Sequence, residues 1–135
     1  MKKITLSFLL VACVATVWAQ QLASNYTIAT MFNGAAFAWN QTSFDFGKIK
    51  HNEPVSNTFT FTNEGTDPLV ITSVQASCGC TVTEYSKDPI APGAKGFVKA
   101  TYNAAKVGQF TKTVTVNANT EDAVVQLTIK GEVTE

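Results

Sequence analysis

From about residue 35 onward, apolar and polar residues alternate in short runs, a period of two that is typical of β-strands. In the clearest run, Phe59 and Phe61 fall on one face and the threonines around them fall on the other. The expected strands are 36–46 with a break at 41–42, 55–63, 69–76, 81–85, 97–102, 110–116 and 124–130. Seven strands with turns at intervals of roughly ten residues predict an all-β fold, an antiparallel β-sandwich.

Inward-facing positions follow from the same alternation. Besides the two phenylalanines, they include Leu69, Ile71, Val98, Ala100, Tyr102, Val125, Leu127 and Ile129. The aromatic residues Phe37, Trp39 and Phe44 are expected to pack in the core near the first strand and not to form a platform for a ligand.

Three pairs of residues are expected to shape turns. They are Asp45 with Gly47, Asn63 with Gly65, and Pro92 with Gly93. The first pair fits a tight bend where a strand changes its partner, and the second fits a strand end that needs left-handed backbone. The third places proline second and glycine third, the pattern of a type II turn.

Residues 1–19 have the layout of a secretory signal peptide. Lys2 and Lys3 precede an apolar run, and Val17-Trp18-Ala19 offers small residues at positions −3 and −1 of a cut before Gln20. The run is shorter than the ~20 residues that a membrane span needs, and no second one follows, so no transmembrane span is expected in the mature chain. Residues 20–34 are then an N-terminal arm or tether, and residues 35–135 are the sandwich domain.

One alternative to simple cleavage is lipidation. Leu10-Val11-Ala12-Cys13 is similar to a bacterial lipoprotein box, in which Cys13 would become the anchored N-terminus. Either route predicts export, to the periplasm, the outer membrane or the extracellular space.

The number and kind of charged residues limit the classes of molecule that this protein is expected to bind. The chain has ten basic and ten acidic residues, and every basic residue is a scattered lysine. Bidentate recognition of phosphates and bases relies on the arginine fork, so the sequence argues against binding to nucleic acid or to an anionic membrane surface.

Two cysteines, Cys78 and Cys80, remain after the leader is removed. In an extended strand their Cα atoms would be ~6.6–6.8 Å apart, at the upper edge of the disulfide range, and Gly79 can bend the chain to bring them closer. Such a bridge would close a very small loop, stabilise the fold little and be easily reduced. Four interpretations of Cys78 and Cys80 therefore remain: a local disulfide, two buried thiols, a redox-active pair and a metal site.

Other chemistry is sparse. Structural zinc needs four ligands, whereas the single histidine, His51, lies far along the chain in a charged turn, so metal binding by Cys78 and Cys80 is the weakest reading and no cofactor is expected. No serine has the G-x-S-x-G context of a hydrolase nucleophile. We therefore expect a protein that is not an enzyme.

Several spaced motifs carry a family resemblance. The segments are Phe44–Ile49 (FDFGKI), Phe59–Gly65 (FTFTNEG), Pro68–Ile71 (PLVI), Ser77–Thr81 (SCGCT) and Ile90–Gly93 (IAPG). Together they resemble the bacterial domain-of-unknown-function family 1573 over about residues 35–133. The resemblance implies an Ig-like sandwich related to Hydin-type and PapD-like domains, and exported proteins that are frequent in Bacteroidota. It implies no established activity, because a fold does not supply one.

The leading functional hypothesis is a non-catalytic module of the cell envelope that binds another protein. An exposed edge strand or the arm at residues 20–34 would make the contact. The alternative is a thiol-redox or metal-handling protein centred on Cys78 and Cys80.

Overall fold

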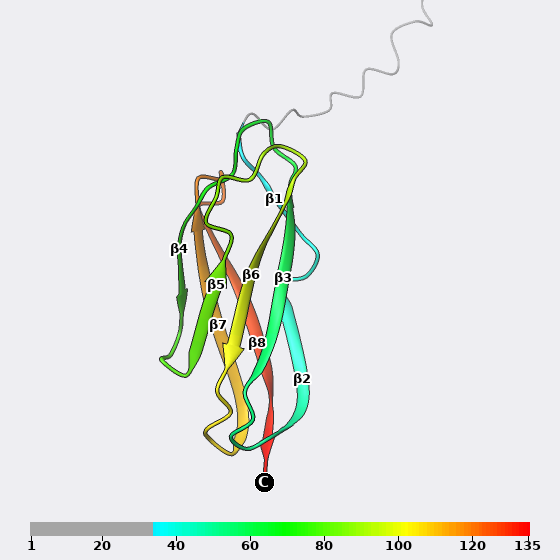
Figure 1. Cartoon of the computed structure of the whole chain (residues 1–135), viewed down its shortest axis with the longest axis vertical. Helices are drawn as coiled ribbons and strands as arrows, with labels where there is room; N and C mark the ends of the chain where they lie inside the picture. The colour runs from blue at the N-terminus through cyan, green and yellow to red at the C-terminus, as the bar shows by residue number, and fades with distance from the viewer. Residues whose placement is uncertain (1–33) are drawn as a thin grey trace, which may run out of the picture. The chain divides into compact units, whose positions relative to one another are not determined.

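Two four-stranded sheets face each other in the computed structural model, which describes residues 34–135 (Figure 1). The described strands are β1 (Phe37–Trp39), β2 (Ser43–Lys50), β3 (Val55–Asn63), β4 (Ile71–Ala76), β5 (Thr81–Tyr85), β6 (Lys95–Tyr102), β7 (Gly108–Ala118) and β8 (Val124–Thr134). One sheet has the order β1-β3-β6-β5 and the other the order β2-β8-β7-β4. The predicted all-β sandwich is thus confirmed, and no helix that could span a membrane occurs in residues 34–135. The leader, Cys13 and most of the arm lie outside the described residues.

The start of the domain differs from the sequence prediction. Residues 36–46 form two strands in different sheets, because the exposed Gln41 and Thr42 carry the chain from one sheet to the other. The described part of the chain therefore has eight strands instead of seven. Moreover, β2 runs parallel to β8, whereas all other strand pairs are antiparallel.

The inner faces of the two sheets form one hydrophobic core. The expected inward positions Phe59, Phe61, Leu69, Ile71, Val98, Ala100, Tyr102, Leu127 and Ile129 are all buried, and Val125 is half-buried against them. Phe37, Trp39 and Phe44 also pack against this core, as predicted. Full burial of each large apolar side chain contributes about 1.5–3 kcal/mol, so the alternating pattern supplies most of the driving force for the fold.

Two of the expected turns have the predicted geometry. Gly93 has a φ of 80°, and the Ala94 N–H donates to the Ala91 carbonyl at 2.9 Å, as in a type II turn. Gly47 has a φ of 66°, and its N–H donates to Asp45 Oδ1 at 2.8 Å. That bend is a bulge within β2, however, because β2 pairs with β8 on both sides of it; the expected change of partner at this point was wrong.

The sequence also predicted left-handed backbone at Asn63 and Gly65. This prediction was wrong, because neither residue has a positive φ. Asn63 is fully buried, and its side-chain oxygen accepts hydrogen bonds from the Ala36 and Gly65 N–H groups at 3.3 and 3.0 Å. Its Nδ2 donates to the carbonyls of Asp67 and Ile90 at 2.8 and 2.9 Å. Gly65 is required because a Cβ there would collide with the backbone of residues 34–36. Both residues therefore serve tertiary contacts.

Replacing Asn63 tests this buried amide. Asn63→Ala removes four hydrogen bonds to main-chain groups, and we expect the free energy of unfolding to fall by at least about 3 kcal/mol in denaturant titrations. The control is Asn40→Ala, which removes one exposed side-chain bond to Thr60 and should cost less than about 1 kcal/mol. Equal losses in the two variants would contradict the role given to Asn63.

A second prediction concerns Gly96 in β6. A Cβ at this buried position would overlap the ring of Phe61 on β3, so Gly96→Ala should lower the free energy of unfolding by about 1–3 kcal/mol. Gly79→Ala is the control, since nothing lies within 4 Å of its added Cβ. If the two alanine variants unfold at the same denaturant concentration, the packing described for Phe61 is incorrect.

Candidate functional site

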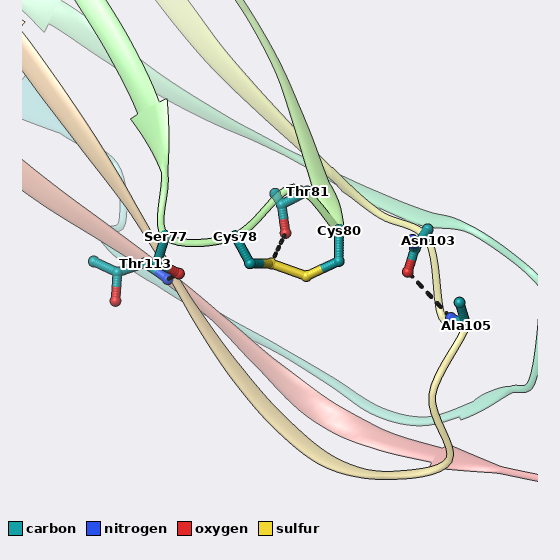
Figure 2. The surroundings of a disulfide bond; sticks show 7 residues. All are labelled: Ser77, Cys78, Cys80, Thr81, Asn103, Ala105 and Thr113. Atoms are coloured by element: carbon teal, nitrogen blue, oxygen red, sulfur yellow. Dashed lines mark hydrogen bonds between the residues drawn. A yellow bond between two sulfur atoms is a disulfide. The ribbon is translucent and has the colours of Figure 1, made fainter.

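The turn between β4 and β5 carries the chain from one sheet to the other and contains both cysteines (Figure 2). On one side, the Ser77 N–H donates to the Thr113 carbonyl at 2.8 Å, and Ser77 Oγ accepts from the Thr113 N–H at 3.1 Å. On the other side, the Cys80 carbonyl accepts from the Asn103 N–H at 3.0 Å. The turn is thus attached to both sheets.

Cys78 and Cys80 meet within this turn. Their Cα atoms are 5.3 Å apart and their Sγ atoms are in bonding contact, drawn as a disulfide in Figure 2. The separation is shorter than that of an extended strand because residues 77–80 form a turn around Gly79. Cys80 packs against the core, and Cys78 Sγ lies 3.8 Å from the hydroxyl of the buried Thr81. This geometry favours a disulfide over two separately buried thiols.

In the described part of the chain, no third metal-ligating side chain joins the two sulfurs. Among residues 34–135 there is no group of three or more histidine, cysteine, aspartate or glutamate side chains placed to hold a metal ion. The ring of His51 instead lies within hydrogen-bond distance of the Ala105 carbonyl, with Nε2 to oxygen at 3.2 Å.

The cysteine turn leads directly into β5, the last strand of its sheet. The Cys80 carbonyl accepts from the N–H of Asn103, directly after β6, and the Ser86 N–H donates to the Phe97 carbonyl within β6. Because the hydrogen-bonding side alternates along an antiparallel pair, Val82 and Glu84 also face β6. Thr83 and Tyr85 consequently direct their N–H and C=O groups away from the sheet, where no described residue pairs with them.

β5 is the most regular of the four sheet edges. β2 and β4 both contain a register shift, and β1 has three residues. Such bulges and short edges hinder the addition of another strand, whereas β5 pairs with β6 without interruption. The sequence predicted an exposed edge strand but did not indicate which one, because the pairing partners are far apart in the chain.

Side chains beside this edge combine apolar and charged groups. Val82 is 64% exposed on the outer face of the sheet. Glu84 lies 3.9 Å from Lys99, and the Lys87 ammonium sits 3.5 Å from the centre of the Tyr85 ring. The geometry suits main-chain pairing with an extended segment.

Solved structures similar to this chain share its fold at low sequence identity. A protein of unknown function from Porphyromonas gingivalis W83 aligns with a TM-score of 0.66 and 17% identity, covering 80% of this chain and 51% of that protein. This chain therefore spans about half the length of that relative. The ASH/PapD-like domain 7 of human CEP192 aligns with a TM-score of 0.61 and 10% identity, over 73% of this chain and 85% of that domain.

An enzyme is also among the similar structures. The VesB protease of Vibrio cholerae aligns with a TM-score of 0.58 and 17% identity, over 73% of this chain and 32% of the protease. Likeness at these identities shows the Ig-like, PapD-like fold alone. No curated protein matches the chain. The family model described as "Protein of unknown function (DUF1573)" matches residues 37–133, so this chain belongs to the DUF1573 family that its spaced motifs predicted.

Proposed function

We propose that this protein is a non-catalytic Ig-like module of the bacterial cell envelope that binds another protein by adding a partner's extended segment to β5. The observation that carries the proposal is the regular edge of β5, where the main-chain groups of Thr83 and Tyr85 have no partner in residues 34–135. In strand addition, main-chain hydrogen bonds supply affinity and alternate side chains supply specificity.

The cysteine turn supports this use of the edge. Because residues 77–80 are bonded to β7 on one side and to β6 through Asn103 on the other, the start of β5 is held in place before any partner arrives. An edge that is already ordered loses less conformational entropy on binding.

The leader at residues 1–19 supports a proposal for the compartment. We propose that the protein is exported to the periplasm or the outer membrane after removal of residues 1–19. Lipidation at Cys13 is the alternative to simple cleavage. An oxidising compartment is where a disulfide between Cys78 and Cys80 would form and persist. The arm at residues 20–34 stays a predicted second contact, since only Gly34 of it is described.

The β5 edge can be tested with one substitution. Thr83→Pro removes an N–H that points away from β6, so we expect the free energy of unfolding to change by no more than about 1 kcal/mol. Capture of envelope proteins by the tagged variant, after cross-linking in cells and mass spectrometry, should fall by at least about tenfold because the added strand loses a main-chain bond.

Two controls make the result specific. Thr83→Val keeps the N–H and should retain capture. Val82→Pro removes an N–H that faces β6, so it should lower the free energy of unfolding by about 2 kcal/mol or more. Recovery of the same proteins in the same amounts with folded Thr83→Pro and with Thr83→Val would refute strand addition at β5.

The thiol-redox alternative is favoured by one observation, the position of the cysteines in a surface turn whose tip, Gly79, is exposed. A partner dithiol could reduce the bond through a mixed disulfide. Cys78 and Cys80 would then gain two electrons and two protons, while the partner's thiols would lose the same and form its disulfide.

A cysteine variant and a thiol assay distinguish a structural bond from a redox-active one. Joint replacement Cys78→Ser and Cys80→Ser opens only a three-residue loop, so the free energy of unfolding should fall by at most about 2 kcal/mol in denaturant titrations. Alkylation of intact cells followed by intact-mass analysis should find both cysteines fully oxidised. A substantial alkylated fraction would favour the redox alternative, and failure of the double variant to fold would contradict the small structural role.

A further inference from the structure

The opposite side of the sandwich contains a second interruption in strand pairing. In the turn before β8, Thr120 forms an isolated bridge with Ala35, and within β8 the Thr128 N–H donates to the Thr42 carbonyl just before β2 begins. Between these points the chain leaves this sheet and forms β1 in the other one. The edge of β8 between the two contacts, from Val124 to Leu127, is therefore not covered by β1 or β2. We call this stretch the β8 window.

Main-chain groups in the β8 window point outward. The Thr128 N–H faces the β2 side, whereas the Ala123 carbonyl accepts from Ala118 of β7. Because the bonding side alternates along a strand, Val124 and Gln126 direct their N–H and C=O groups toward the open edge. Within residues 34–135 no main-chain partner reaches them.

A cleft lies directly beside the β8 window. Its volume is about 670 Å³, within the range of sites that accept side chains or small ligands. Its apolar lining comes from Phe37 and Trp39 of β1, whose rings stack at 4.9 Å, and from Val125 of β8. A segment added along β8 would place alternate side chains toward this lining.

The charged residues around the cleft have one sign. Glu64 lies on one side, Glu121 and Asp122 lie in the β7–β8 turn, and no lysine is among the residues that line the cleft. The Thr120 hydroxyl donates to the Asp122 carbonyl at 2.9 Å, which orders that turn. A cation with an apolar stem, such as a lysine or arginine side chain, complements both the carboxylates and the aromatic rings.

We propose that the β8 window and its cleft bind a short extended segment of another protein that carries a lysine or arginine. The chain's own arm does not have this chemistry, since residues 20–33 contain no basic residue. The cleft is lined by β1, and β1 and β5 lie at opposite edges of their sheet. The site at the β8 window is therefore separate from the β5 edge. It goes beyond the proposed function, and either site can fail in experiment without the other.

Two matched peptides test the site. The probe is the blocked peptide Thr-Val-Thr-Lys-Thr-Val-Thr, and the comparison peptide has glutamate in place of lysine. Binding to the purified protein is followed by the indole N–H resonance of Trp39, which is assigned with the Trp39→Phe variant. The lysine peptide should shift this resonance and bind at least about tenfold more tightly than the glutamate peptide.

Variants separate the two parts of the site. Glu121→Gln combined with Asp122→Asn, which leaves only Glu64 charged at the cleft, should weaken the preference for lysine, whereas Glu84→Gln on β5 should leave it unchanged. Gln126→Pro removes an outward N–H, so it should abolish binding of the lysine peptide while its unfolding transition stays close to that of the parent. No shift of the Trp39 resonance at about 5 mM lysine peptide, or equal affinity for the two peptides, would overturn the proposal.

Discussion

Packing two apolar sheet faces against each other forces the chain to cross between the sheets, and these crossings create the exposed edges of this molecule. One crossing follows β1 and leaves the first residues of β8 paired with β7 on one side but without a neighbouring strand on the other. Another follows β4, passes through Cys78 and Cys80, and makes β5 the last strand of its sheet. An Ig-like sandwich buries its core well but does not close its sheets, so it retains main-chain groups that can pair with another chain.

Asn63 links this core to the loops at one end of the sandwich. Its side chain joins residue 36, which lines the cleft beside β8, to the loops that contain Asp67 and Ile90. A fully buried amide with four satisfied hydrogen bonds fixes one arrangement of these loops, because any alternative would leave polar groups unpaired away from water. The same residue thus supports the stability of the fold and the shape of the cleft.

The sequence predicted the class of fold and most of the core because these depend on local alternation. Phe59, Phe61 and Leu127 fall on inner faces by the period of two alone, and the type II turn at Pro92 and Gly93 follows from the two residues themselves. The division of residues 36–46 between two sheets depends on pairing with β3, more than 20 residues away, and with β8, more than 80 residues away, where Thr128 bonds to Thr42. For the same reason, the sequence predicted an exposed edge but not the outward direction of Thr83 or Gln126.

Residue-resolved hydrogen exchange of the free protein tests the central claim that these edges are unpaired. The amides of Thr83, Val124 and Gln126 should exchange at least about a hundredfold faster than those of Val82, Glu84, Val125 and Leu127, which face a neighbouring strand. Protection of Thr83, Val124 and Gln126 equal to that of their neighbours would contradict the account, because it would show that both edges are already covered.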